Sequence, residues 1–499
     1  MDNSSLNRIF GYTISSTGLT SMNNSPFNVP NNAGVDTQMD IDPTSSFLYA
    51  MDTASPTQPI DAFAIGTGGA LTPITETLQV PSSPSLGIQQ ISVDPSGKFL
   101  FAVYGGAHEV WTYSIAPAGG TNPGTLTLVT RMRLRSDTSL INAQLLSGGT
   151  TAVQFTPQAL YVTNSGSSNV SQFSIAPSTG TLTSLASPLG VGNQPEGIAV
   201  LPDNSFAYVA YFMAGGLATF SITNDVLSSV GQPVNTGLGP SSLVIDLSGS
   251  FLYNVNQGDS DIWEYPIGSG MLSTGTKQQA TDAAPVFVTT EPTGQFVYTA
   301  NSGAGTINTF AITLPGGGLH SSGASVGAGG PSPSTNWIAI DPSGRFLYST
   351  SIHANALSEF LITTGSGLPT ANSNPYLPVG PASDSGAGSV VVEPTGKFVY
   401  ASNQLLNQIY AFAIDPATGL LSAAQGSLSG GAVANTGTSP VALAVDISGQ
   451  FLYCVNSGSN DINIYTINLA DGSLTPVGTS TVPTGGTTPV GIALSGTIQ

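Results

Sequence analysis

The residues best suited to acid–base chemistry and anion binding gather in one stretch of the chain. Arg131, Arg133 and Arg135 stand at alternate positions, so on a strand they would share one face. His108 and Glu109 precede them in a turn that we expect at the same rim of the fold. Guanidinium groups bind anionic oxygens and an imidazole can act as a general base, so this group could bind an anionic sugar acid. The alternative is that the arginines are solvated or paired with acids and that His108 caps a turn.

Further candidates stand where the inner strands of the repeats described below are otherwise small or apolar. We expect these strands to border a central channel, so a polar side chain or an indole there could hold a ligand. For the indole, the alternative is a packed core tryptophan. The candidates are Gln38 and Asp40, Gln90 and Gln154 in the first three repeats, Glu196 at the start of the fourth, and Trp337 in the seventh.

Other kinds of chemistry find no support in the sequence. The three histidines lack the spacing of metal ligands, and the short glycine runs lack the strand–loop–helix context of a phosphate site. No Gly-x-Ser-x-Gly elbow lies between a strand and a helix. We therefore expect neither a metal nor a cofactor.

Composition excludes several partners. The chain has 499 residues with 27 acidic and 8 basic side chains, and a net charge of −19 argues against nucleic acid and anionic membranes. No apolar run is long enough to span a membrane. The single cysteine, Cys454, excludes an intramolecular disulfide. The scarcity of Lys and Arg favours an extracellular or cell-surface protein whose leader is absent from this chain.

One phrase recurs along the whole chain and decides the architecture. It is an apolar run, then Asp/Glu-Pro-Ser/Thr-Gly, then Phe-Leu/Val-Tyr, as in IDPSGRFLY (340–348) and VEPTGKFVY (392–400). Its copies stand 45 to 60 residues apart, which is typical of the four-stranded blades of a β-propeller. The aromatic anchors are Tyr49, Phe101, Tyr161, Tyr208, Tyr253, Tyr298, Tyr348, Tyr400 and Tyr453.

The two ends of the chain predict how the ring closes. DNSSLNRIFGYTI (2–14) aligns with SNQLLNQIYAFAI (402–414), and TPVGIALSGTIQ (488–499) aligns with the start of the last repeat. Residues 1–30 and 487–499 would then share one blade. We therefore expect an all-β fold, a single closed propeller over residues 1–499 with about ten blades. A nine-bladed ring with loose ends and a split into two rings are the alternatives.

Several phrases mark a resemblance to a known family. YVTNSGSSNV (161–170), FLYCVNSGSNDI (451–462) and FVYTANSGAGTI (296–307) resemble the YVTN-repeat propellers. The wider group is similar to the lactonase-type propellers, which include 6-phosphogluconolactonases. This resemblance implies a propeller, in most members seven-bladed, with His, Arg and Glu at the channel mouth. No residue of this sequence matches a site motif of that family, so the resemblance assigns no site residue.

The near absence of acid–base residues favours a non-catalytic scaffold that binds a protein or glycan partner across its rims. The alternative is a lactonase-type hydrolase that opens a sugar lactone in the sector of the first three repeats. A second alternative is self-assembly, in which a neighbouring chain donates a strand to the closure blade.

Overall fold

The computed structural model is built of antiparallel sheets, and its described residues contain no α-helix. It describes residues 155–498 with gaps at 314–315, 329–333, 364, 373–375, 382–385, 425–431 and 479–480, and before residue 134 mainly the strands named below. The chain divides into two compact units, Met1–Ala152 and Val153–Gln499, which differs from the single domain that we expected. No helix in the described part is long and apolar enough to cross a membrane.

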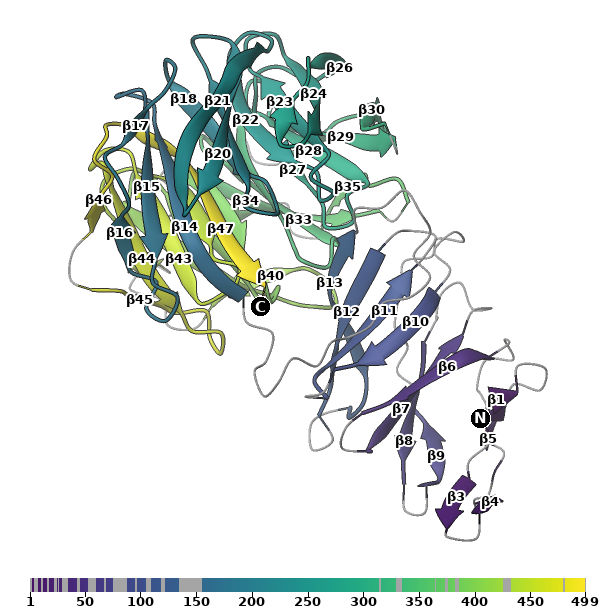
Figure 1. Cartoon of the computed structure of the whole chain (residues 1–499). Helices are drawn as coiled ribbons and strands as arrows, with labels where there is room; N and C mark the ends of the chain where they lie inside the picture. The colour runs from purple at the N-terminus through teal and green to yellow at the C-terminus, as the bar shows by residue number, and fades with distance from the viewer. Residues whose placement is uncertain are drawn as a thin grey trace. The chain divides into compact units, whose positions relative to one another are not determined.

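The described residues of the second unit form seven sheets, which we number in chain order (Figure 1). Sheet 1 holds β14 (Phe155–Asn164), β15 (Asn169–Ile175), β16 (Leu182–Ser184), β17 (Leu189–Gly190) and β47 (Pro489–Ile498). Sheet 2 holds β18 (Pro195–Val200), β19 (Phe206–Tyr211), β20 (Gly216–Thr223) and β21 (Val226–Asn235). Sheet 3 holds β22 (Pro240–Ile245), β23 (Phe251–Asn256), β24 (Asp261–Gly268), β25 (Met271–Leu272) and β26 (Thr276–Ala280).

Each of the remaining four sheets has an inner strand, two central strands and an outer strand that is divided into two short pieces. Sheet 4 holds β27 (Pro285–Thr290), β28 (Phe296–Asn301), β29 (Thr306–Thr313), β30 (Gly318–Ser321) and β31 (Val326–Gly327). Sheet 5 holds β32 (Thr335–Ile340), β33 (Phe346–Ser351), β34 (Ala356–Ile362), β35 (Pro369–Ala371) and β36 (Leu377–Pro378). Sheet 6 holds β37 (Ala387–Val392), β38 (Phe398–Asn403), β39 (Gln408–Ile414), β40 (Leu421–Ala423) and β41 (Ala432–Asn435). Sheet 7 holds β42 (Pro440–Val445), β43 (Phe451–Asn456), β44 (Asp461–Ile467), β45 (Leu474–Pro476) and β46 (Val482–Pro483).

The recurring phrase forms the hairpin between the inner strand and the next strand in sheets 2 to 7, as the sequence indicates. In sheet 5, Oδ1 of Asp341 accepts hydrogen bonds from the amides of Arg345 (2.8 Å) and Phe346 (2.7 Å). Gly344 ends the turn with a φ of 69°, a conformation that favours glycine. The strand that follows is buried on both faces, as all six residues of β33 are, which explains its aromatic and β-branched composition.

The Phe and Tyr of the phrase clamp a turn of the following sheet. In sheet 3, the hydroxyl of Tyr253 donates a 2.7 Å hydrogen bond to the carbonyl oxygen of Gly317 in sheet 4, and the ring of Phe251 packs against the same glycine. Gly317 has a φ of 72° and no room for a Cβ. The same tyrosine bond joins Tyr161 to Asp225 (2.9 Å), Tyr208 to Gly270 (2.8 Å), Tyr298 to Gly367 (2.7 Å), Tyr348 to Gly419 (2.9 Å), Tyr400 to Gly472 (3.1 Å) and Tyr453 to Gly180 (3.1 Å).

The last of these bonds runs from sheet 7 back to sheet 1. The inner strands follow the same circuit, because β47 contacts β18 on one side and β42 on the other. β47 (yellow in Figure 1) pairs with β14 along its whole length, from Pro489 opposite Asn164 to Ile498 opposite Phe155. The seven inner strands therefore contact one another in an unbroken sequence.

Among its described residues, the first unit holds two further four-stranded sheets and the N-terminal strands. The two sheets pack around a shared core that includes Trp111 and Tyr113, and Tyr49 donates a 3.0 Å bond to the carbonyl oxygen of Gly124. One sheet holds β6 (Val35–Ile41), β7 (Phe47–Asp52), β8 (Ile60–Ile65) and β9 (Leu71–Pro73), and the other β10 (Ile88–Val93), β11 (Phe99–Tyr104), β12 (Glu109–Ile115) and β13 (Leu126–Arg133). The N-terminal strands are β1 (Asp2–Asn3), β2 (Arg8–Ile9) and β5 (Phe27–Asn28) in one sheet, and β3 (Tyr12–Ser15) and β4 (Gly18–Ser21) in another.

The predicted closure between residues 1–30 and 487–499 is wrong. The C-terminal segment is an inner strand, as its alignment indicates, but it joins β14 and not the N-terminal strands. FTPQALY (155–161) lacks the Asp-Pro-Ser-Gly turn that would connect β14 to an inner strand of its own. Self-assembly by strand donation depended on a missing second strand beside the C-terminal strand, and β14 occupies that place.

Removal of one clamp hydroxyl tests this account of sheet-to-sheet stability. We expect Tyr453→Phe to lower the free energy of unfolding by about 1–2 kcal/mol, because the buried Gly180 carbonyl loses its donor. Chemical denaturation measures the change. Tyr376→Phe is the matched control, since Tyr376 is 42 % exposed, and it should leave stability unchanged. Equal stability of both variants would contradict the clamp.

A methyl group at a clamp glycine should be more damaging. Gly270 has a φ of 78°, and a Cβ there would overlap the ring of Phe206. We expect Gly270→Ala to destabilise the protein by about 2–4 kcal/mol in thermal or chemical unfolding. Gly268→Ala is the control, because a Cβ at Gly268 meets no atom within 4 Å. A loss at Gly268 as large as that at Gly270 would count against the proposed fit.

Candidate active site

The inner strands of the second unit surround a cavity of about 760 Å³. A ring of aliphatic side chains runs around its wall, because the fourth residue of each inner strand is Ile, Leu or Val. These residues are Ile198, Leu243, Val288, Ile338, Val390, Leu443 and Ile492. Polar side chains enter the cavity near the ends where the inner strands begin. A cavity that combines apolar side chains with convergent polar groups is the usual form of a small-molecule site.

Glu196 is the one ionisable side chain among the described residues that line this cavity. It is the second residue of β18, and Ser165 donates a 3.1 Å hydrogen bond to its Oε1 atom. Burial raises the pKa of the Glu196 carboxyl above its usual range, and the bond from Ser165 offsets part of this rise. The carboxylate is therefore a stronger base than one in water.

The backbone of Glu196 is fixed by the neighbouring inner strand. Its carbonyl oxygen accepts a 2.6 Å bond from Oγ1 of Thr163, which in turn accepts a 3.0 Å bond from the amide of Gly491. A Cβ at Gly491 would overlap both partners, so β47 must carry glycine to approach β18 this closely. Sheet 1, completed by β47, thus helps to hold the carboxylate in place.

Uncharged donors and an aromatic pair line the same cavity. Asn336 on β32, and Gln257 and Gln404, which directly follow β23 and β38, supply amide groups. Trp337 packs against Phe287 with ring centroids 4.4 Å apart. Trp337 also packs against buried core residues, so it lines the cavity and belongs to the core at the same time.

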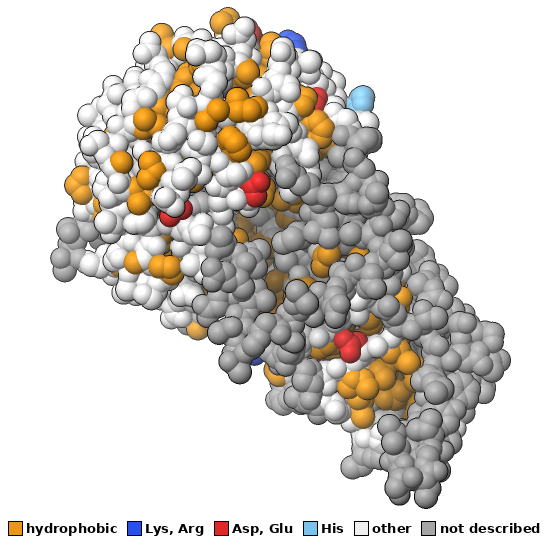
Figure 2. Space-filling model, viewed as in Figure 1, with side chains coloured by type: hydrophobic (Ala, Val, Ile, Leu, Met, Phe, Trp, Pro, Cys, Tyr) orange, Lys and Arg blue, Asp and Glu red, His pale blue; other side chains and the backbone are white. Residues whose placement is uncertain are grey.

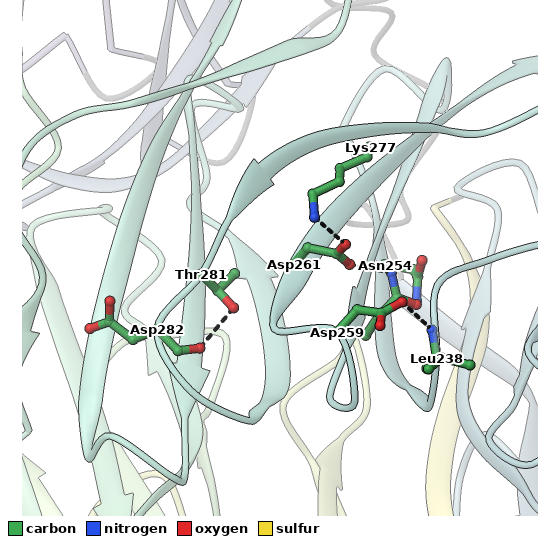
Figure 3. A network of polar contacts seen from close by, with 8 residues as sticks. Leu238, Asn254, Asp259, Asp261, Lys277, Thr281 and Asp282 are labelled. Carbon is green, nitrogen blue, oxygen red and sulfur yellow. Dashed lines mark hydrogen bonds and ion pairs between the residues drawn. The ribbon is translucent and has the colours of Figure 1, made fainter.

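The cationic side chains of residues 153–499 are few, and each is placed outside the cavity lining. Lys277 on β26 forms a 2.9 Å ion pair with Asp261 on β24 (Figure 3). Arg345 donates to the carbonyl oxygens of Pro416 and Ala417, at 3.2 Å and 3.1 Å. The others are Lys397 in the turn before β38, His320 on β30 and His353 in the turn after β33.

Figure 2 shows the same scarcity on the face that it draws. Its described surface is largely white and orange, with charged side chains standing singly. The sequence from 153 to 499 holds 17 Asp and Glu against 3 Lys and Arg, so the unit is strongly negative. No group of three or more His, Cys, Asp or Glu that could hold a metal occurs among the residues described.

The structure brings together only two of the residues that the sequence singled out. Glu196 and Trp337 both line the cavity. Arg131 and Arg133 lie on β13 of the first unit, opposite Trp111 and Glu109 of β12. His108, Arg135 and Gln154 lie outside the described residues.

The polar positions of the first two repeats also belong to the first unit. Asp40 lies on β6, and its carboxylate accepts bonds from the amides of Val93 (2.7 Å) and Ile41 (2.8 Å). This satisfies the carboxylate within the protein, so Asp40 links two sheets. Gln38 lies on the same strand and Gln90 on β10. We expected these residues in one channel because we expected one ring.

Asn336, Gln257 and Gln404 were missed by the sequence analysis. Asn336 holds the position on β32 that Glu196 holds on β18, where β42 and β47 carry Val441 and Val490. Comparison of the repeats at this position would have found it. The two glutamines follow strand ends at which other sheets carry serine, so the same comparison reveals them.

Comparison with known families decides the nature of the second unit. The family model described as lactonase, 7-bladed β-propeller, matches residues 118–237, 224–351 and 337–490. The chain belongs to this lactonase family. Seven blades agree with the seven sheets of the second unit, and the prediction of about ten blades is wrong. The recurring phrases identify blades correctly, but they do not show which blades share a ring.

Solved structures of similar fold carry related descriptions. A candidate 6-phosphogluconolactonase of Bacteroides uniformis is 21% identical, with a TM-score of 0.58, over 68% of this chain and 99% of that chain. A candidate 6-phosphogluconolactonase of Bacteroides fragilis is 20% identical, with a TM-score of 0.58, over 68% and 98%. The periplasmic gluconolactonase of Pseudomonas aeruginosa is 18% identical, with a TM-score of 0.56, over 68% and 98%. At these identities the likeness shows the fold alone, and no curated protein matches the chain.

These findings correct the functional interpretation of the sequence. The scarcity of acid–base residues suggested a non-catalytic binding scaffold, but membership of the lactonase family favours the alternative of a lactone hydrolase. The scarcity itself is real. The described lining of the cavity nevertheless retains one ionisable side chain, Glu196.

The raised pKa of Glu196 makes a prediction about stability and pH. Because folding raises the pKa of Glu196, the folded state favours the neutral acid. The contribution of the neutral acid to stability is fully present below the unfolded pKa of 4.5, and it is lost as pH rises through the folded pKa. We expect Glu196→Gln to become more stable relative to the parent protein between pH 4 and pH 7, measured by chemical denaturation.

Asp415→Asn is a control of opposite sign. Bonds from the amides of Thr418 and Ala417 lower the pKa of Asp415, so its contribution is present above the unfolded value and is lost as pH falls. This variant should lose stability relative to the parent as pH rises from 2 to 5. A Glu196→Gln difference that stayed constant with pH would contradict a raised pKa of the half-buried Glu196 carboxyl.

Proposed function

We propose that residues 155–498 form a closed seven-bladed ring and that this ring hydrolyses a lactone, with Glu196 as the general base. One observation carries the proposal: Glu196 is the single ionisable side chain among the described residues of the cavity wall, and it is half-buried and hydrogen-bonded by Ser165. Membership of the lactonase family supplies the reaction class.

The reaction needs only one proton carrier. The Glu196 carboxylate takes a proton from a water molecule as its oxygen attacks the carbonyl carbon of the lactone. The tetrahedral intermediate then collapses, the ring C–O bond breaks, and the protonated Glu196 returns the proton to the departing alkoxide. One lactone and one water thus give one hydroxy acid, and the carboxylate is regenerated.

The amide side chains of the cavity can stabilise the charge that develops on the carbonyl oxygen. Asn336, Gln257 and Gln404 carry N–H donors from three different sheets, and none of them brings a positive charge. Neutral donors held in fixed positions around a cavity can act as an oxyanion site. The raised pKa of Glu196 suits this scheme, because its carboxylate is a better base than an exposed glutamate.

Replacement of the carboxylate tests the proposal directly. We expect Glu196→Gln to reduce kcat for lactone hydrolysis by about 100-fold or more, with little change in KM, because the amide keeps the shape but accepts no proton. Proton release at constant pH measures the rate with glucono-1,5-lactone, δ-valerolactone and dihydrocoumarin, after subtraction of spontaneous hydrolysis. In the parent protein kcat should fall as pH drops through the raised pKa of Glu196.

Glu264→Gln is the matched control. Glu264 also has a pKa raised by burial, but it lies on β24 outside the cavity lining, where its Oε2 accepts a 2.7 Å bond from Gln278. This variant should keep full activity. Full activity of Glu196→Gln, or no hydrolysis of any of the three lactones by the parent protein, would overturn the proposed function.

A further inference from the structure

The wall of the cavity restricts the substrates that it can accept. Apart from Glu196, its described residues are aliphatic, aromatic or neutral polar groups. All five cationic or imidazole side chains of residues 153–499 are described, and none lines the cavity. Recognition of a phosphate or carboxylate in a protein site normally employs Lys, Arg or a helix N-terminus, and the described residues contain no α-helix.

The net negative charge of residues 153–499 also disfavours the binding of anionic ligands. A dianionic phosphate in the cavity would approach the Glu196 carboxylate with no cation in the wall to screen it. The seven-sheet unit as a whole carries 17 acidic against 3 basic residues, so its field repels anions before they reach the mouth.

The rim at the Glu196 end carries exposed apolar side chains. β18 begins beside the end of β19, because Pro195 pairs with Tyr211, so Glu196 lies at the end of the unit that holds the β19–β20 turn. Met213 in that turn is 68% exposed, Leu238 in the loop before β22 is 67% exposed, and Leu405 in the β38–β39 turn is 64% exposed. These side chains extend the apolar character of the wall outward.

We infer that the cavity selects uncharged lactones with an alkyl or aromatic substituent and rejects phosphorylated sugar lactones. This inference rests on the proposed function for its reaction and on the cavity wall for its substrate class. The substituent would lie against the aliphatic inner ring and the Phe287–Trp337 pair, while the lactone carbonyl stays near Glu196 at the mouth.

A graded set of substrates tests the inference. We expect kcat/KM to rise from δ-valerolactone to δ-nonalactone by about fourfold for each methylene that enters the cavity. Glucono-1,5-lactone should fall at least tenfold below δ-nonalactone, and 6-phosphoglucono-1,5-lactone at least 100-fold below it. A phosphorylated or sugar lactone that is hydrolysed as well as δ-nonalactone would overturn the inference.

Binding measured apart from turnover separates the two proposals. Calorimetry with 6-butylpiperidin-2-one, the lactam that corresponds to δ-nonalactone, should show binding, and 6-phosphogluconate should show none. If the lactam binds and no lactone is hydrolysed, the ligand class stands and the proposed function fails. If the lactam does not bind, the inferred ligand class is wrong whatever the activity.

A change of charge in the wall gives a positive test. Val441 holds on β42 the position that Glu196 holds on β18, and it lines the cavity. We expect Val441→Arg to gain measurable affinity for 6-phosphogluconate and to lose affinity for the lactam, whereas Val441→Met should keep the parent preference. Thermal unfolding of both variants checks that they fold. Binding of 6-phosphogluconate by the parent protein would contradict the inference.

Discussion

The structure depends on one contact, in which a Tyr of each sheet of the second unit, joined by a Phe in sheets 2 to 7, closes around a turn of the next sheet. The hydroxyl satisfies a buried carbonyl, and the ring occupies the space that a side chain would need. Each sheet is too small to bury its own faces, so it must lean on two neighbours, and this contact fixes the distance and angle at which it does so. The recurrence of Phe-x-Tyr in sheets 2 to 7 reflects this shared geometry and carries no information about chemistry.

The site uses the positions that this packing leaves free. The second residue of the inner strand lies beside the cavity in these sheets, and its type differs from sheet to sheet. It is Glu196 in β18, Asn336 in β32 and Val441 in β42. Within one inner strand, some residues therefore pack the sheets together and others are free to serve the site. A lone carboxylate placed among aliphatic residues gains basicity from the wall that surrounds it, because the same burial that excludes charge also raises its pKa.

The blade-level architecture could be predicted from the sequence because every blade meets the same packing demand with the same residues. The sequence could not predict which sheets belong to the seven-sheet unit, because the sheets of both units carry the recurring Asp-Pro-Ser-Gly phrase. Two local signals were available. Phe101, the one anchor without a hydroxyl, belongs to the last four-stranded sheet of the first unit and cannot donate to a following turn, and the segment before Tyr161 lacks the Asp-Pro-Ser-Gly hairpin. Glu196 and Trp337 were found as departures from the repeat, whereas the first-unit residues were assigned to the same channel only because one ring was expected.

The pairing of β47 with β14 also has a consequence for biosynthesis. The amide of Ala159 bonds to Oγ of Ser495 across 336 residues of sequence, so the first sheet of the second unit stays open until almost all of that unit has left the ribosome. During this interval the free edge of β14 is exposed to other nascent chains, and a chaperone that covers extended edges would improve the yield of folded protein.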